Sequence, residues 1–299
     1  MGSHLKLKAY GKINLALDVL RKREDGYHEV RMIMQTVGIY DQVELLRRGD
    51  PGITVETNLT YLPSNENNLA YRAAQLLMEE FQVKQGLHIQ LKKFLPVAAG
   101  MAGGSSDAAA VLFGVNKMFQ LGLSMEELMK RGVKIGADVP YCIMRGTALS
   151  EGIGEKLTPL PPMPQCHVVI AKPGISVSTR YVYENLHANE LRPDQHPDID
   201  GMAEAIRQQD FYQAAKKLGN VLELVTAKRY PVIEEIKEAM KQGGAVNALM
   251  SGSGPTVFGL FTRQEKAQEV YEALRYGSLS RLAKQAYLTN FYHIRQDER

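Results

Sequence analysis

The sequence contains little cysteine, with only Cys142 and Cys166 among its 299 residues. Their spacing fits neither a disulfide framework nor a metal-binding pair, so we expect a protein of the reducing cytoplasm. There is no apolar run long enough for a membrane span, and no signal-peptide pattern. Lysine and arginine number 36 against 33 acidic residues, and a net charge of +3 does not indicate nucleic acid as the main partner.

Several familiar catalytic and nucleotide-binding motifs are missing as well. The sequence has no G-x-x-x-x-G-K-[ST] loop, and no G-x-G-x-x-G follows an expected strand. The protein-kinase signature set, the G-x-S-x-G nucleophile elbow and H-E-x-x-H are all absent. These absences exclude P-loop, protein-kinase, hydrolase-elbow and zincin interpretations.

The length and composition indicate a globular protein of two domains, since 44% of the residues are hydrophobic and 23% are charged. Thr158–Pro164 holds four prolines, which forbid a helix or an interior strand, and it is the best candidate for a linker. We therefore expect domains at 1–163 and 164–299, with the last strand able to return to the first domain. Met1–His4 resembles a cloning remnant, so His4 is left out of the candidate residues.

The stretch that organises the chain is Pro96–Ala110, where small residues lead into a helix. Gly100, Gly103 and Gly104 let the backbone take positive φ, and we expect residues 105–107 to cap the helix. A glycine-rich loop that precedes a helix N-terminus presents free N–H groups and a positive dipole end, which suit a phosphate. The alternative is a tight connection with no ligand.

The first strand, from Leu5, alternates so that Lys12 and Asn14 share one face. These two residues form a candidate polar site, although a solvated edge strand would show the same pattern. Asp25-Gly26 predicts a hairpin turn, and Tyr27 and His28 follow it. This pair could bind a base or simply lie on the surface.

Asp138, in Gly136–Pro140, stands between two expected helices, and taken alone it fits a helix N-cap.

We expect His187 and His196 to be solvated. Further strands are expected at 30–39, 43–46, 53–56, 88–91, 168–171, 246–250, 257–261 and 286–292. Further helices are expected at 70–81, 108–119, 125–134, 178–186, 202–208, 210–227, 231–241 and 264–276.

Three separated motifs together resemble those of the GHMP small-molecule kinases, which include galactokinase, homoserine kinase and mevalonate kinase. They are Gly11–Leu15, Pro96–Ala110 and Asn247–Val257. The resemblance implies an α+β, two-domain GHMP kinase fold. Its N-terminal domain would be like ribosomal protein S5 domain 2 and its C-terminal domain would be ferredoxin-like, with the site between them.

Asp25–His28 and Gly136–Pro140 resemble a subgroup of the family that acts in non-mevalonate isoprenoid biosynthesis. The implied reaction is ATP- and Mg²⁺-dependent phosphorylation of 4-diphosphocytidyl-2-C-methyl-D-erythritol to its 2-phosphate. The implied partners are this small molecule, with no nucleic acid and no membrane, in a monomer or weak homodimer. The metal ligands stay unassigned.

The resemblance also implies roles for individual residues. Asp138 would be the catalytic base and Lys12 its catalytic partner. The implied ATP-binding residues are Asn68, Lys93, Pro96, Val97, Ala98, Ala99, Gly100, Met101, Ala102, Gly103, Gly104, Ser105 and Ser106. The implied residues for the acceptor substrate are Asn14, Tyr27, His28, Thr179, Tyr183, Ser253 and Gly254.

Two alternatives stay open at this point. Another GHMP kinase, for mevalonate or homoserine, would not need the Tyr27-His28 turn, because those acceptors carry no base. A nucleotide- or RNA-binding module without catalysis would not need both Lys12 and Asp138, and the charge balance does not favour RNA.

Overall fold

The computed structural model describes residues 3–294. Residues 1–2, part of the expected cloning remnant and of the first expected domain, lie outside the described residues. So do residues 295–299 of the second expected domain. The chain forms two compact units. The first comprises 1–11, 39–97 and 102–144, and the second comprises 12–38, 98–101 and 145–299. Strands β1 (His4–Lys22) and β2 (His28–Arg48) therefore each contribute to both units. Thr158–Pro164 lies within the second unit rather than between the two.

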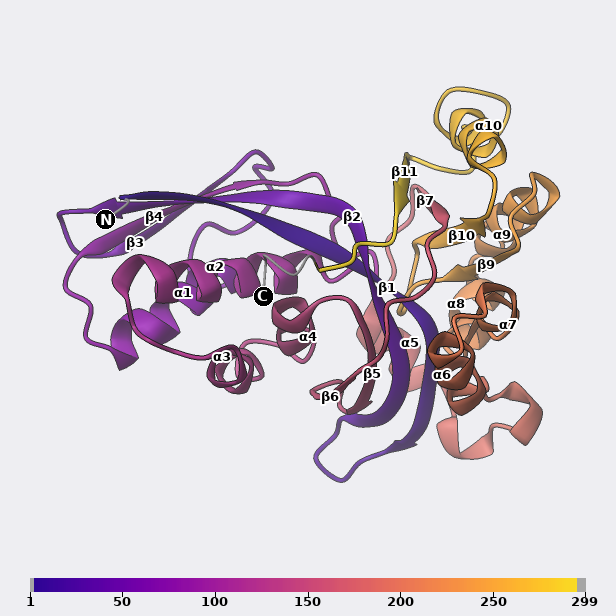
Figure 1. The fold of residues 1–299 in the computed structure, drawn as a ribbon, viewed down its shortest axis with the longest axis horizontal. Coiled ribbons are helices and arrows are strands. Elements are labelled where there is room, and N and C mark those ends of the chain that lie inside the picture. Colours follow the sequence, from indigo (N-terminus) through magenta and orange to yellow (C-terminus); the bar gives the residue numbers. More distant parts are fainter. Residues whose placement is uncertain (1–2, 295–299) are drawn as a thin grey trace. The chain divides into compact units, whose positions relative to one another are not determined.

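The first unit is a sheet with helices on it. The C-terminal part of β2 pairs antiparallel with β4, and β4 pairs parallel with β3. Helices α1 and α2 pack side by side, and α1 contacts β3 and β4 (Figure 1). The elements are β3 (Ile53–Thr57), α1 (Leu69–Glu80), β4 (Gly86–Lys92), α2 (Gly103–Phe119), α3 (Met125–Gly132) and α4 (Val139–Met144).

Helix α2 is the central helix of this unit because it is buried on most of its surface. Gly114 shows how close the packing is. A Cβ there would lie 2.3 Å from Leu45 Cδ1 and 2.7 Å from Leu7 Cδ1, so only glycine lets α2 approach β1 and β2 this closely. The predicted apolar face of α1 is confirmed, since Ala70, Ala73 and Leu77 are buried.

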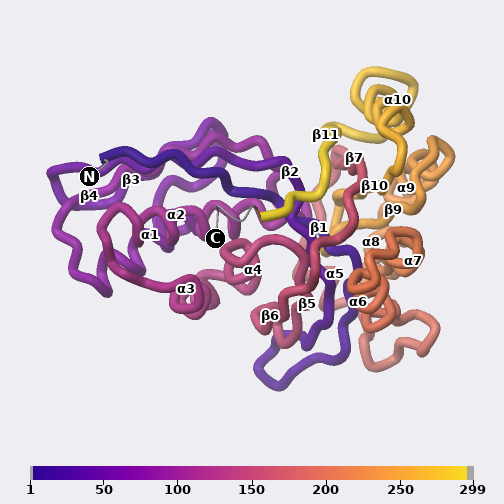
Figure 2. The backbone as a smooth tube through the Cα atoms, viewed as in Figure 1, coloured from indigo at the N-terminus to yellow at the C-terminus, as the bar shows by residue number. Residues whose placement is uncertain are grey.

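The second unit contains a four-stranded antiparallel sheet in the order β11-β7-β10-β9. In chain order the strands and their helices run strand, helices, two strands, helix, strand, which is the ferredoxin-like arrangement that the resemblance implied. Figure 2 follows this path from β9 through α10 to β11. After β11, Phe291 bridges to Val37 of β2.

The rest of the second unit surrounds its share of β1 and β2. The N-terminal part of β2 pairs with β5, β5 pairs with β6, and β1 pairs with the short β8. The elements are β5 (Thr147–Gly152), β6 (Lys156–Pro159), β7 (His167–Lys172), α5 (Thr179–Asn185), α6 (Ile199–Arg207), α7 (Phe211–Lys216), β8 (Gly219–Asn220), α8 (Glu223–Arg229), α9 (Val232–Gln242), β9 (Asn247–Met250), β10 (Val257–Phe261), α10 (Gln264–Arg275), β11 (Gln285–Asn290) and the 3₁₀ turns Ala188–Glu190 and Pro193–Gln195.

Two sequence-based predictions of secondary structure are wrong. The expected strands 30–39 and 43–46 are one long strand, β2. The expected helix 210–227 is divided into α7, β8 and α8, because Gly219 and Asn220 pair with β1. In the glycine-rich loop, Gly100 has positive φ (76°), but Gly103 and Gly104 do not, and Ala102 takes this conformation instead (φ 55°).

None of the helices between residues 3 and 294 has the length and apolar character that a bilayer crossing requires.

Left-handed backbone at Ala102 leads to a stability prediction. Replacing Ala102 by glycine relieves about 1–2 kcal/mol of backbone strain. This gain offsets the added entropy of the unfolded chain, so the free energy of unfolding should change little. The matched change Ala109→Gly, in the right-handed interior of the same helix, should lower the free energy of unfolding by about 1 kcal/mol or more. Urea denaturation of both variants measures the difference, and equal losses would contradict the strain at Ala102.

Candidate functional site

Helix α2 starts without a side-chain cap. Its first residue is Gly103, and the carbonyl of the N-cap residue Ala102 accepts from Ser106 N at 2.8 Å. Ser105, Ser106 and Asp107 all lie inside the helix, so the prediction that they cap it is wrong. The Ser106 hydroxyl donates instead to the carbonyl of Tyr10 at 2.7 Å. Among the described residues, no side chain accepts from the first N–H groups of α2, and they are available to an anion.

The turn that carries Asp138 lies beside this helix start. A Cβ built on Gly136 would lie 3.9 Å from Ser105 Oγ and 3.7 Å from Val139 Cγ2. Asp138 is half-buried just before α4, and its carbonyl accepts from Cys142 N at 3.0 Å. The first unit therefore brings the Gly136–Asp138 turn next to the first turn of α2.

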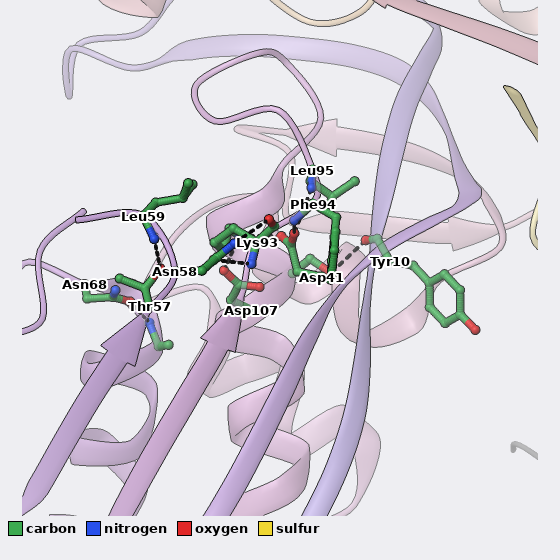
Figure 3. Close-up of polar contacts among 12 residues, drawn as sticks. Tyr10, Asp41, Thr57, Asn58, Leu59, Asn68, Lys93, Phe94, Leu95 and Asp107 are labelled. Carbon is green, nitrogen blue, oxygen red and sulfur yellow. Dashed lines mark hydrogen bonds and ion pairs between the residues drawn. The ribbon is translucent and has the colours of Figure 1, made fainter. Parts of the chain in front are cut away.

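Asn68 and Lys93, both expected to bind ATP, have structural partners (Figure 3). The Asn68 side chain caps α1, since its Oδ1 accepts from Ala70 N at 2.9 Å, and its Nδ2 donates to the carbonyl of Pro63 at 2.8 Å. Lys93 is buried, and its ammonium group donates to both Asp41 and Asp107. Burial opposes the charge on Lys93, but the two carboxylates outweigh it and raise the lysine pKa.

In the second unit, Lys12 and Asn14 are buried rather than solvated. Lys12 Nζ donates to Asn14 Oδ1 at 2.8 Å, and the Lys12 backbone N–H donates to the carbonyl of Met101 at 3.2 Å. Ser251 is fully buried, its Oγ accepts from Asn14 N at 3.2 Å, and it donates to the carbonyl of Gly100 at 2.9 Å. One hydroxyl thus joins β1, the glycine-rich loop and the loop after β9.

The loop after β9 is held by several side chains. Asn220 Nδ2 donates to the carbonyls of Met250 and Gly252, each at 2.8 Å. Thr179 and Ser253, both expected to bind the acceptor, have their hydroxyls 2.8 Å apart. Gly254, in the same expected set, has φ 83°, and its N–H donates to the carbonyl of Ser251 at 3.0 Å.

A cavity of about 270 Å³ in the second unit brings together two of the residues expected to bind the acceptor, His28 and Tyr183. The rings of His28 and Tyr183 are 5.0 Å apart at their centroids and tilted by 47°. The full lining is Lys22, His28, Tyr183, Glu184, Leu186, His187, Ala188, Asn189 and Glu190.

The ionisation of His28 suits a neutral partner. Burial and the charge of Lys22 lower the pKa of His28, so at pH 7 the ring is neutral and offers one donor and one acceptor.

Tyr27, 60% exposed, does not line this cavity. His187 is exposed as expected, but His196 is not fully solvated, since its Nδ1 lies 2.8 Å from Asp18 Oδ1.

Sequence reasoning missed four residues at these positions. Ser251 stands at the start of the Ser-Gly-Ser-Gly segment, which could have drawn attention to it. Asn220 lay within an expected helix, so nothing in the pattern indicated its role. Asp41 is far in the sequence from Lys93, and Asp107 was assigned to a helix cap.

Taken unit by unit, these groups are the parts that phosphoryl transfer to a hydroxyl requires. The first unit supplies an uncapped helix N-terminus, which suits a phosphate, and next to its first turn the segment Gly136–Asp138, which carries a carboxylate that could accept a proton. The second supplies a lysine, a fixed glycine-rich segment and a cavity with an aromatic ring and a neutral imidazole.

The family models agree with this interpretation. Residues 68–146 match the model described as GHMP kinases N terminal domain, and residues 202–278 match GHMP kinases C terminal. A relative from Lachnoclostridium phytofermentans, named 4-diphosphocytidyl-2-C-methyl-D-erythritol kinase, is 57% identical over 96% of this chain and 97% of its own length. The chain belongs to the GHMP kinase family. It is therefore an ATP-dependent small-molecule kinase with the two-domain GHMP fold.

Other relatives are similar to this chain in sequence, in fold or in both. A relative of the same name from Geobacillus is 52% identical over 91% of this chain and 93% of its own length. A crystal structure of 4-(cytidine 5'-diphospho)-2C-methyl-D-erythritol kinase, 30% identical, superposes with a TM-score of 0.79 and covers 97% of this chain and 100% of that one. Homoserine kinase from Cytophaga hutchinsonii, at 20% identity, TM-score 0.76 and coverage of 97% and 95%, shares the fold.

The Ser251 hydroxyl gives a testable prediction for this GHMP kinase. Ser251→Ala leaves Asn14 N and the Gly100 carbonyl without their partner, which should cost about 1–3 kcal/mol of stability and weaken nucleotide binding. Ser150→Ala is the matched control, because that buried hydroxyl also donates to a carbonyl, of Gly154 at 2.8 Å.

Thermal denaturation and steady-state kinetics of both variants separate the two effects. We expect both to lose stability but only Ser251→Ala to raise the KM for ATP. If the two variants share the same KM for ATP, Ser251 has no part in arranging the loop.

Proposed function

We propose that this kinase transfers the γ-phosphoryl group of ATP to a hydroxyl of 4-diphosphocytidyl-2-C-methyl-D-erythritol, giving the 2-phosphate, in non-mevalonate isoprenoid biosynthesis. The observation that carries the proposal is the cavity with His28 and Tyr183, which offers a ring face and a neutral imidazole to a base. The printed names of the most similar relatives agree with it.

In this proposal Asp138 accepts the proton of the acceptor hydroxyl, and Lys12 stabilises charge on the transferring phosphoryl group. The transition state of phosphoryl transfer is loose, so orientation and charge matter more than strong basicity. The hydrogen bond from Lys12 to Asn14 fixes the direction of the ammonium group. Asn14 acts beside Lys12.

The remaining proposed roles follow the two substrates. Residues 96–106 cradle the ATP phosphates, with the uncapped start of α2 as the main anion site. Asn68 lies on the adenine side through the start of α1, which it caps. Tyr27, Thr179, Ser253 and Gly254 contact the acceptor around the His28–Tyr183 cavity.

We also propose that Mg²⁺ accompanies ATP. Within residues 3–294 there is no group of three or more His, Cys, Asp or Glu side chains placed to hold a metal. In kinases, substrate phosphates and waters usually supply most ligands of Mg²⁺. When bound, the ion would neutralise phosphate charge, and we assign it no protein ligand.

Further proposals concern the organisation of the whole protein. We propose that 1–163 and 164–299 are the two functional domains, and each family model falls within one of these segments. We place the enzyme in the cytoplasm, since cysteine is scarce in the sequence, and we expect a monomer or weak homodimer.

Substrate discrimination tests the proposed acceptor. With ATP and Mg²⁺, the cytidyl compound should be phosphorylated, and mevalonate and homoserine should not. Tyr183→Ala should raise the acceptor KM about tenfold to a hundredfold, because it removes one stacking contact with the base. The KM for ATP should not change. The control Tyr276→Ala removes a ring that is 73% exposed on the surface and should change neither constant. If mevalonate were turned over equally well, the proposed identity of the acceptor would be wrong. The protein would then be a GHMP kinase that acts on another substrate.

Asp138→Asn tests the proposed base. Loss of a positioned proton acceptor should lower kcat about a hundredfold or more, with nucleotide binding preserved. Asp210→Asn is the control, because Asp210 caps α7 through Gln213 N and asparagine caps equally well. Near-normal kcat in a folded Asp138→Asn enzyme would return Asp138 to a capping role.

A further inference from the structure

Three buried charged residues of the first unit have no part in the proposed transfer step, although the resemblance implied that one of them, Lys93, binds ATP. They are Asp41 on β2, Lys93 after β4 and Asp107 in α2, called here the charge cluster (Figure 3). Their side chains are at most 4% exposed. Lys93 Nζ donates to one oxygen of each carboxylate.

The charge cluster holds the segment of chain that enters the glycine-rich loop. Asp41 Oδ1 accepts from two successive backbone groups, Phe94 N at 2.5 Å and Leu95 N at 2.8 Å. Asn58 fixes the backbone of Lys93, accepting from its N–H at 2.8 Å and donating to its carbonyl at 3.2 Å. The residues just before Pro96 therefore have a fixed path.

The same cluster also holds the segment that leaves the loop. Asp107 belongs to the N-terminal part of α2, where Lys93 holds it. Gly103, the first residue of α2, packs directly on the cluster. A Cβ there would lie 3.6 Å from Asp41 Oδ2, 3.6 Å from Lys93 Nζ and 3.5 Å from Leu95 Cβ. Both ends of the loop thus meet at one buried group of charges.

We infer that the charge cluster positions the uncapped start of α2 for nucleotide phosphates, with Asp41 and Lys93 as positioning residues and Asp107 as the group that sets the charge beneath the anion site. This inference rests on the proposed binding of ATP at α2. It also gives Lys93 a different role from the direct contact with the nucleotide that the resemblance implied, because its ammonium group already holds two carboxylates.

The charge balance of the cluster responds to pH. Two carboxylates face one ammonium group, and Asp107 Oδ1 is buried with no hydrogen-bond partner among the described residues. Burial raises the pKa of Asp107 to about 7, against the attraction of Lys93, and the neighbouring charge of Asp41 adds to the rise. Lys93 and Asp41 are the charged groups that act on Asp107, and the buried face of α1 beside α2 is apolar.

The sign of the pH effect follows from these charges. Below about pH 7 Asp107 is protonated and the cluster is neutral, whereas above it the cluster carries one negative charge beneath an anion site. Nucleotide affinity should therefore fall as the pH rises through this range. The phosphate group titrates in the same region, so the comparison must be made between wild type and variant.

The experiment measures binding of a non-hydrolysable ATP analogue with Mg²⁺ by calorimetry, without acceptor. Asp41→Asn keeps an oxygen for Phe94 N and Leu95 N but removes one negative partner of Lys93. Loss of this negative charge alone would favour an anion, so weaker binding would report a shift of the helix start, and we expect a loss of about tenfold or more. Separate turnover assays should show an unchanged acceptor KM. Glu44→Gln, on the same strand and paired with His4 and Lys6, is the matched control and should bind as wild type does.

Asp107→Asn tests the charge separately from the geometry. Its affinity relative to wild type should rise from pH 6 to pH 8, because only the wild type gains a negative charge. Folded Asp41→Asn with wild-type affinity, or a constant ratio for Asp107→Asn, overturns the inference. Because no acceptor is present, a failure of the cytidyl substrate assignment would appear only in the turnover assay and is distinguishable.

Discussion

The structure of the first unit depends on a helix that starts without a cap. The first N–H groups of a helix have no partner within the helix, and a serine, threonine, aspartate or asparagine at the N-cap often accepts from them. At the start of α2, Gly103 and Ser105 are half-buried and Gly104 is exposed, so these N–H groups can be reached by a ligand. At α2 the hydroxyl of Ser106 is committed to Tyr10 and the carboxylate of Asp107 to Lys93. The residues that could have capped the helix serve its packing instead, and the N–H groups are left to a ligand.

Keeping such a helix end in place requires support from elsewhere in the chain. In the first unit the support comes from the close approach of α2 to the sheet at Gly114 and from the charge cluster. In the second unit the preceding residues of the same loop are held at Gly100 by Ser251, and Asn220 fixes the strand end and loop that carry Ser251. Each support is a buried polar group with its hydrogen bonds made, and such groups specify one conformation.

Much of this arrangement could be predicted from local pattern. β10 has its predicted range, 257–261. Its pattern, an apolar run between turn residues, can be recognised from neighbouring residues alone. The start of α3 at Met125 also agrees with the expected range 125–134, and a capping box of Ser124 and Glu127 fixes it locally. Predictions failed at positions where a residue far away in the sequence determines the local structure. Asn220 leaves the helical pattern because it pairs with Leu17 of β1, and Asp41 reaches Lys93 across 52 positions of the chain.

The central claim is that nucleotide phosphates bind the uncapped N-terminus of α2. Backbone amide chemical shifts of the isotopically labelled enzyme, recorded during titration with a non-hydrolysable ATP analogue and Mg²⁺, test it most directly. The account predicts the largest perturbations at the amides of Gly103, Gly104 and Ser105. Saturable binding that leaves these three amides unchanged would contradict it.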